Sequence, residues 1–370
     1  MKFTVTLLFT LTVSALSAQV ITDDRLTALI KKGADQIYNA NPDSANVYIA
    51  ILEEELPDHP VVPLMRAMTL LWEHILVISP EVFEELQSNL YLTVELAQKK
   101  DPKLKEPEMI FFAMAAHGLL AEYFADQGSY IRAIGEANRA YGLLKKGFDL
   151  VEDYPEFLFA AGMYNYFRVK YPEKHPIYRP LLWFFRGGDT TKGLSQLEEA
   201  CYSSPLTKVE ARIYLSYIYL RYEYEPEKAQ DHLQLLCVSY PNNFYVKTKF
   251  LESMANPSDF KRVSPEMIGE LEAHESPYYR LAGAIFEGYY QEHVLADIEE
   301  AELAYRQGLD IGEEIEGHGE YLKSLGYLGL GRISIGKGEE KEATQLLKQA
   351  LDLAETDQVK SEAKELLSQL

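Results

Sequence analysis

The chain has 370 residues, of which 47% are hydrophobic and 25% charged, and this usage excludes a disordered or collagen-like polypeptide. Lysine and arginine number 36 against 57 aspartates and glutamates, which gives a formal net charge of −21. A surface this acidic repels phosphate backbones and anionic membranes, so nucleic acid is not an expected partner.

The first 18 residues, MKFTVTLLFTLTVSALSA, have the pattern of a cleavable secretory signal. One cation, Lys2, precedes an apolar stretch that ends in small residues and is shorter than the roughly 20 apolar residues that span a bilayer. We expect cleavage after Ala18 and a mature protein that begins at Gln19. The predicted location is the periplasm, with secretion as the alternative. No later segment has the length of a membrane span.

A recurring spacing of small and apolar residues predicts a series of helices along the mature chain. The first residue of the pattern is followed four and seven positions later by others on the same helical face, and a proline often follows and ends the helix. The clearest copies are 36 residues apart: Gly193, Leu197, Ala200, Pro205 and Ala229, Leu233, Leu236, Pro241. Further copies are Ala45, Ile49, Leu52, Pro57; Leu90, Val94, Ala97, Pro102; Ala133, Ala137, Ala140; Ala301, Tyr305, Gly308; and Ala343, Leu347, Ala350.

Another helix is predicted before each copy, so that each pair forms a helical hairpin. The step of 72 between Ala229 and Ala301 is long enough to contain a further hairpin, with a helix that starts at Pro265 behind a Ser264 cap. Alternating strand patterns bracketed by turns are almost absent. We therefore predict an all-α solenoid of about eight hairpins over residues 19–370, without clear domain borders.

Two of these units resemble the tetratricopeptide repeat (TPR) family. The resemblance rests on Leu120, Ala121, Gly128, Tyr130, Ala133, Ala140 and on Tyr327, Leu330, Gly331, Gly338, Ala343, Ala350. It implies a right-handed superhelix with a concave groove that binds a protein or peptide partner without catalysis. Positions beside the inward-facing residues predict groove side chains at Glu122, Arg212, Ser216, Tyr219 and Arg332, and Asn165 and Arg168 are assigned to the same groove.

Residues 171–189 depart from the repeat and form a predicted insertion. Between Arg168 and Lys192 the local charge is +4, and the stretch contains the apolar run Leu181–Phe185. One interpretation is a contact surface for an anionic ligand or a partner, made by Arg179, Trp183 and Arg186. The simpler interpretation is a short helix that plugs the solenoid, with its cations solvated or paired to acidic residues.

A narrower stretch, GMYNYFRVKYP followed by FFRGGDTTKGLSQLEEA, is similar to an element of some bacterial and mitochondrial outer-membrane TPR proteins. These include the exported T component of TRAP transporters. This resemblance implies the alternative function of binding a small molecule or lipid for a transporter or an envelope-maintenance system. The implied pocket lies near Asn165, Arg168 and Trp183. Asn165 itself is either a satisfied buried amide or a ligand contact.

No motif predicts catalysis, a metal or a cofactor. Residues 331–337 match the GxxxxGK spacing, but Gly338 follows where a serine or threonine would hold magnesium, and no strand precedes. His318 lies among Glu313, Glu314, Glu316 and Glu320, without a second imidazole or thiolate at ligand spacing. We therefore predict a binding protein rather than an enzyme.

The two cysteines, Cys201 and Cys237, occupy the same place in successive hairpins. Neighbouring helices pack about 8–10 Å apart, which exceeds the roughly 7 Å between Cα atoms that a disulfide can bridge. Both are predicted to be buried free thiols.

Overall fold

The computed structural model describes residues 20–174, 176, 185–315 and 318–370, and these ranges contain helices and no strand. The prediction of an all-α fold is confirmed. The helices are α1 (Asp24–Tyr38), α2 (Pro42–Glu55), α3 (Val61–Glu73), α4 (Pro80–Lys100), α5 (Pro107–Asp126), α6 (Tyr130–Gly147), α7 (Glu156–Lys174), α8 (Thr190–Ser203), α9 (Lys208–Ile218), α10 (Pro226–Ser239), α11 (Phe244–Met254), α12 (Pro257–Phe260), α13 (Pro265–Glu272), α14 (Pro277–Tyr290), α15 (Ile298–Gly312), α16 (Glu320–Lys337), α17 (Glu340–Leu353) and α18 (Asp357–Leu367). Two π-helical segments, η2 (Tyr219–Glu223) and η3 (Gln291–Leu295), extend α9 and α14.

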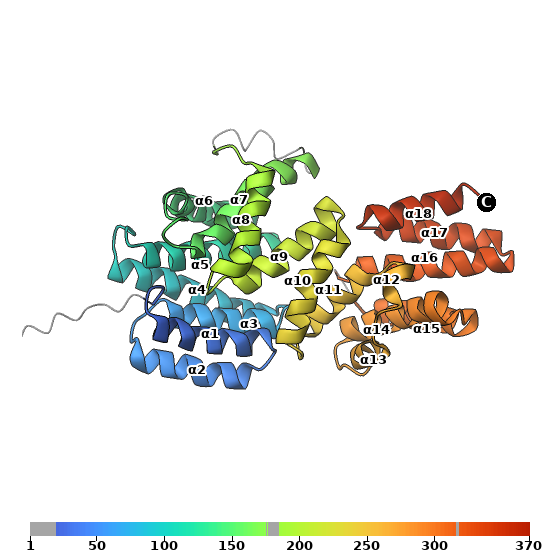
Figure 1. Cartoon of the computed structure of the whole chain (residues 1–370), viewed down its shortest axis with the longest axis horizontal. Helices are drawn as coiled ribbons and strands as arrows, with labels where there is room; N and C mark the ends of the chain where they lie inside the picture. The colour runs from blue at the N-terminus through green and yellow to red at the C-terminus, as the bar shows by residue number, and fades with distance from the viewer. Residues whose placement is uncertain (1–19, 175, 177–184, 316–317) are drawn as a thin grey trace, which may run out of the picture.

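Helices that follow one another in the chain pack in pairs, α11 and α13 across the short helix α12 (Pro257–Phe260), and each pair packs on the next (Figure 1). The pairs within the described ranges are α1/α2, α3/α4, α5/α6, α7/α8, α9/α10, α11/α13, α14/α15 and α16/α17, with α18 packed on the last pair. This is a TPR-like array of eight helical hairpins, as the spacing predicted. No helix of these ranges has the length and apolar character needed to cross a membrane.

The repeated spacing occupies the second helix of each hairpin, where its residues form the contact with neighbouring helices. In α2, for example, Ala45, Ile49 and Leu52 are fully or almost fully buried. The prolines also act as predicted: Pro57, Pro102, Pro205 and Pro241 each come two residues after the last residue of a helix. Ala137 and Ala140 of α6 belong to the same repeated pattern, but they line a cavity.

The 72-residue step between Ala229 and Ala301 also appears in the structure. The segments η2 and η3 begin 72 residues apart, and each is followed by a residue in the left-handed conformation, Tyr224 (φ 55°) or Ala296 (φ 59°). The helix predicted at Pro265 is α13, with Ser264 at its N-cap position. The Ser264 hydroxyl donates to the side chain of Glu266 and does not cap a backbone N–H group, so this part of the prediction is wrong. The unit between Ala229 and Ala301 nevertheless contains the additional hairpin that the sequence predicted.

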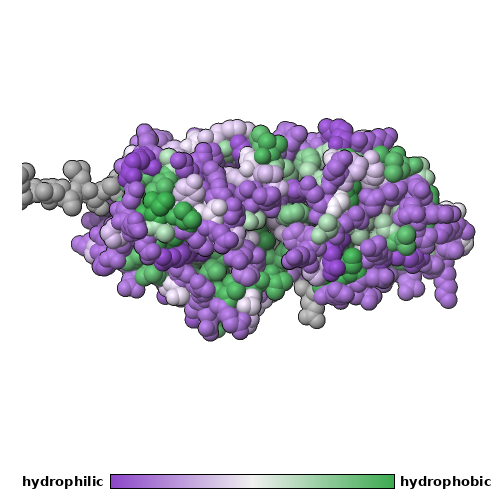
Figure 2. All heavy atoms as spheres, turned by 90° about the horizontal axis from the view of Figure 1, so that it is seen from below, coloured by the Kyte–Doolittle hydropathy of each residue, from purple (hydrophilic) through white to green (hydrophobic). Residues whose placement is uncertain are grey.

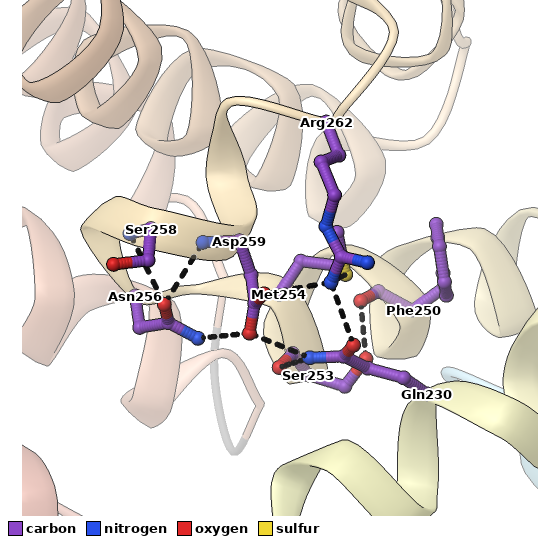
Figure 3. A network of polar contacts seen from close by, with 8 residues as sticks. All are labelled: Gln230, Phe250, Ser253, Met254, Asn256, Ser258, Asp259 and Arg262. Atoms are coloured by element: carbon purple, nitrogen blue, oxygen red, sulfur yellow. Dashed lines mark hydrogen bonds and ion pairs between the residues drawn. The ribbon is translucent and has the colours of Figure 1, made fainter.

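A polar network holds short α12 against α10 within this unit (Figure 3). The side chain of Asn256 accepts hydrogen bonds from the backbone N–H groups of Ser258 (3.2 Å) and Asp259 (3.0 Å) and so caps α12. Asp259 in turn accepts from Asn256, at 2.7 Å, and from Gln230 of α10, at 3.2 Å. Arg262 completes the network with an ion pair to Asp259.

The insertion is shorter than predicted at its start. Tyr171 and Pro172 belong to α7, which continues to Lys174. Pro172 therefore lies inside the last turn of α7 and does not end the helix before it. At the other end, Asp189 caps α8 by accepting from the backbone N–H of Lys192 at 2.9 Å. The signal-like residues 1–18, and also Arg179 and Trp183, lie outside the described residues.

The array curves until its first hairpin touches the turn between α10 and α11. Asn243 donates to the carbonyl oxygen of Tyr38 at 2.7 Å, and the backbone N–H of Asn242 donates to the side chain of Asn39 at 3.0 Å. We call this set of contacts, together with the bonds of Tyr240 and Tyr38 described below, the closure contact. It closes one side of the space on the concave face of the first five hairpins, and this space stays open to solvent on another side.

Candidate binding cavity

A cavity of about 470 Å³ lies in this space and is bounded by α1, α3, α5, α6, α7 and α9; we call it the central cavity. Its walls are almost entirely apolar and include Ile30, Leu64, Met65, Met68, Met114 and Phe159. Its volume is within the range of roughly 300–1,000 Å³ that is usual for small-molecule sites. Elsewhere, as Figure 2 shows for one face, the surface is mostly hydrophilic with scattered apolar patches.

Small residues explain why this space is not filled. Ala115, Gly118 and Ala121 of α5 face it, together with Ala137 and Ala140 of α6. The residue that corresponds to Ala137 in other hairpins is large, such as the fully buried Leu197 or Leu347. A Cβ atom added at Gly118 would meet no heavy atom within 4 Å. The sequence therefore has small side chains here, at positions where other hairpins have large side chains that fill the space by packing.

Three glutamates place carboxyl groups at the cavity wall. Tyr214 of α9 donates its hydroxyl to Glu122 of α5 at 3.1 and 3.2 Å, and Tyr38 of α1 donates to Glu210 of α9. Glu156 accepts from the backbone N–H of Leu206 at 3.0 Å. Burial raises the pKa of Glu156 and of Glu210 to about 7, and it also raises the pKa of Glu122.

These raised pKa values have a common cause. Glu122 is open to solvent through the cavity, yet the protein around it displaces enough water to disfavour its charged form. The carboxyl groups are thus weaker acids than at an ordinary surface. An apolar ligand therefore meets a wall in which Glu156 and Glu210 can become neutral near pH 7.

Of the predicted groove residues, Glu122 lines the central cavity and the others lie elsewhere. Ser216 is buried and bonds within its own helix, to the carbonyl oxygen of Arg212 at 2.7 Å. Tyr219 is buried and donates to Glu198 at 2.7 Å. Arg212 donates to the carbonyl oxygen of Cys201 at 3.0 Å. These three lie between neighbouring hairpins, away from the cavity wall.

These three residues do not line the cavity because α9 is rotated about its own axis relative to the predicted orientation. The sequence analysis placed Arg212 and Ser216 on the groove face of this helix. In the structure Glu210 and Tyr214 face the cavity, one turn apart on α9. The i, i+4 pairing of a glutamate with a tyrosine is the signal that could have indicated this face.

The remaining predicted residues are also dispersed. Asn165 is buried and donates to Gln196 at 2.6 Å, which makes it a satisfied amide. Arg168 lies beside Gly188. Arg186 places its guanidinium 4.7 Å from the ring of Phe148, and its backbone N–H donates to Tyr141 at 2.9 Å.

Arg332 of α16 belongs to a separate ion-pair cluster in the C-terminal half. It forms two 2.7 Å bonds with Glu292 and a third with Glu362. Tyr305 also donates to Glu292, at 2.7 Å. Because these partners use the guanidinium fully, Arg332 serves to join η3, α16 and α18.

The described residues contain no group of three or more histidine, cysteine, aspartate or glutamate side chains that could hold a metal ion. His318 is described, but Glu316 beside it is outside the described residues. Both cysteines are free thiols, with Cys201 buried and Cys237 half-buried, and burial raises the pKa of each to about 12.

No family model and no curated protein match the sequence. Among solved structures, the crystal structure of yeast Tom70 is similar, with a TM-score of 0.39 and 12% identity over 92% of this chain and 80% of that chain. A similarity at this level carries no argument about function, which has to rest on the cavity itself.

Proposed function

We propose that this protein is a non-enzymatic binding protein that holds an apolar ligand in the central cavity. The observation that carries the proposal is an apolar space of about 470 Å³ whose volume depends on small residues in α5 and α6. Interiors normally close such gaps because an unfilled void forfeits packing contacts. A ligand that fills the cavity would regain those contacts.

Two kinds of occupant fit an apolar cavity. The closure contact favours a small molecule or a lipid chain, because it shuts one side of the groove against an extended polypeptide. The repeat architecture favours a protein or peptide partner, because arrays of hairpins present extended concave surfaces. In that case apolar side chains of the partner would enter the cavity from its open side.

Export is part of the proposal and rests on residues 1–18, whose cation, apolar stretch and small residues match a secretory signal. The proposed location is the periplasm, with secretion as the alternative. Expression of the full chain in a Gram-negative host, followed by fractionation and N-terminal sequencing, tests this. A mature protein that begins at Gln19 supports export, whereas an intact N-terminus in the cytoplasm contradicts it.

The substitution Gly118→Leu tests the cavity function. Gly118 faces the cavity and an added Cβ meets nothing within 4 Å, so the leucine side chain enters the empty space. Replacement of a glycine inside a helix also favours folding by up to about 1 kcal/mol. We expect the variant to be at least as stable as the wild type and to lose most of its affinity for N-phenyl-1-naphthylamine, a neutral apolar fluorescent probe.

Gly135→Leu is the matched control, because Gly135 is also inside a helix, has open space at its Cβ and is not among the cavity-lining residues. Native mass spectrometry of the wild type, purified from cells, distinguishes the occupants: a retained small mass indicates a small molecule or lipid, and a copurified polypeptide indicates a protein partner. Equal probe binding by the Gly118→Leu and Gly135→Leu variants would contradict the proposal.

A further inference from the structure

A second cavity, of about 460 Å³, lies on the other side of the closure contact; we call it the aromatic cavity. It is bounded by the end of α3, residues 74–77 that follow it, and the beginnings of α11 and α14. Ile37 lines both cavities and is the residue that their walls share. The other residues that line the two cavities differ.

Several aromatic rings lie in the wall of this cavity, among aliphatic and polar side chains. The lining residues include Trp72, Phe244, Tyr245 and Tyr279, together with His74 and His274. The ring of His274 lies 4.4 Å from that of Phe244 and 4.7 Å from that of Tyr279. Trp72 meets Tyr245 at 6.3 Å in an edge-to-face arrangement. These mutual contacts fix the directions of the rings, so the site is preorganised.

The ring of His274 is held neutral. Its Nδ1 atom accepts a hydrogen bond from the backbone N–H of Ser276 at 2.9 Å, which leaves the ring proton on Nε2. Burial lowers the pKa of His274. In its neutral form this side chain adds no positive charge to the wall.

Charged side chains also lie in or near the wall of the aromatic cavity. Among the described residues that line the aromatic cavity, Glu73 carries a charge and none is a lysine or an arginine. Lys247 and Lys249 approach Phe244 and Tyr245, at 4.7 and 5.7 Å from the ring centres, but neither lines the cavity. Each is paired with a carboxylate: Lys247 with Glu270, and Lys249 with Glu252. Their positive charges are thereby compensated.

We propose that the aromatic cavity binds a small organic cation, an ammonium group that carries apolar substituents. The faces of aromatic rings attract such cations electrostatically, and the attraction is strongest when water is displaced from the site. Glu73 supplies the opposite charge, and the net charge of −21 draws cations toward the molecule as a whole. An anionic ligand would meet the carboxylate of Glu73, which repels it.

Ligand binding can be measured through the fluorescence of Trp72, which lines the aromatic cavity. The chain has 2 tryptophans, and the substitution Trp183→Phe leaves Trp72 as the single one. Choline is the cationic probe, and 3,3-dimethylbutan-1-ol, in which carbon replaces the ammonium nitrogen, is its uncharged isostere. We expect choline to change the Trp72 fluorescence saturably at constant ionic strength, with an affinity about 5- to 30-fold above that of the isostere, the factor that cation–π attraction of about 1–2 kcal/mol provides.

Two variants identify the groups responsible. Phe244→Leu removes one ring while it keeps a large apolar side chain, and Glu73→Gln removes the charge from an exposed residue. We expect both to weaken choline binding and Glu54→Gln, an equal change of charge at an exposed site on α2, to leave it unchanged. Should Phe244→Leu fail to fold, which its circular dichroism melting curve reveals, Glu73→Gln still decides the question.

Three outcomes overturn the proposal: equal or tighter binding of the uncharged isostere, choline affinity that is unaffected by Glu73→Gln, or no saturable change of Trp72 fluorescence with either probe. Isothermal titration calorimetry with choline gives an independent affinity. A Gly118→Leu variant provides a further check, since the central cavity is separate and its occlusion should leave choline binding intact.

Discussion

The hydroxyl of Tyr240 donates a hydrogen bond to the carboxylate of Asp35 at 2.8 Å, and these residues are 205 positions apart in the chain. A second bond of the same kind joins Tyr38 to Glu210, 172 positions apart. In a simple linear array each hairpin would contact only its neighbours. Here the first hairpin also contacts the fifth and separates the two cavities.

Removal of the Tyr240 hydroxyl should therefore loosen the closure contact. We expect Tyr240→Phe to lower the free energy of unfolding by roughly 1–2 kcal/mol, because Asp35 loses its partner in a half-buried site. Hydrogen exchange should become faster at residues 38–41 in particular. Tyr130→Phe, at an exposed tyrosine of α6, is the control. Exchange that accelerates equally throughout the chain would indicate global destabilisation instead of local opening.

The stability of the protein should depend on pH in part because of Glu156. Burial raises its pKa to about 7 from 4.5, so between these values the folded state holds a proton that the unfolded state releases. The free energy of unfolding should accordingly fall as pH rises from about 4.5 to about 7. Glu210 has a pKa shifted in the same direction and adds to this fall.

Glu156→Gln tests that assignment, because its amide is neutral throughout and can still accept the backbone N–H of Leu206. We expect the variant to lose part of the pH slope in urea unfolding curves measured between about pH 4.5 and 7, relative to a Glu340→Gln control on the exposed side of α17. An unchanged slope would show that Glu156 is already ionised at low pH in the folded protein.

Two glycines of α16 should respond oppositely to alanine. At Gly329 an added Cβ overlaps the ring of Tyr305, which is fully buried and bonded to Glu292. We expect Gly329→Ala to destabilise the protein by about 1–3 kcal/mol. Gly336 has open space at its Cβ, so Gly336→Ala should stabilise by up to about 1 kcal/mol. Thermal unfolding of the two variants checks both signs, and equal signs would contradict the packing at Tyr305.

Cys201 and Cys237 should react slowly with thiol reagents. Burial raises the pKa of both to about 12, and only the thiolate is an effective nucleophile. We expect little labelling by iodoacetamide at pH 8 in the native protein and rapid labelling of both residues in guanidinium. Intact mass should show no loss of two hydrogens in protein purified from an oxidising compartment. A mapped disulfide between them would contradict the register of the hairpins.

The sequence by itself determined the helices and their order, since these depend on local patterns. The spacing of Ala45, Ile49 and Leu52 and its copies places apolar residues on one helical face, and prolines such as Pro57 end the helices. The additional hairpin before Ala301 was also predictable, because Ser264 and Pro265 form a local start signal. These features need no knowledge of distant contacts.

The tertiary structure alone decided where the cavities lie. Glu122 was predictable from its own helix, whereas Glu210 and Tyr214 depend on the rotation of α9, which packing against other hairpins sets. The closure between Asp35 and Tyr240 depends on curvature summed over five hairpins. Small changes in each interhelical angle accumulate along such an array, so a local pattern cannot determine which distant residues meet.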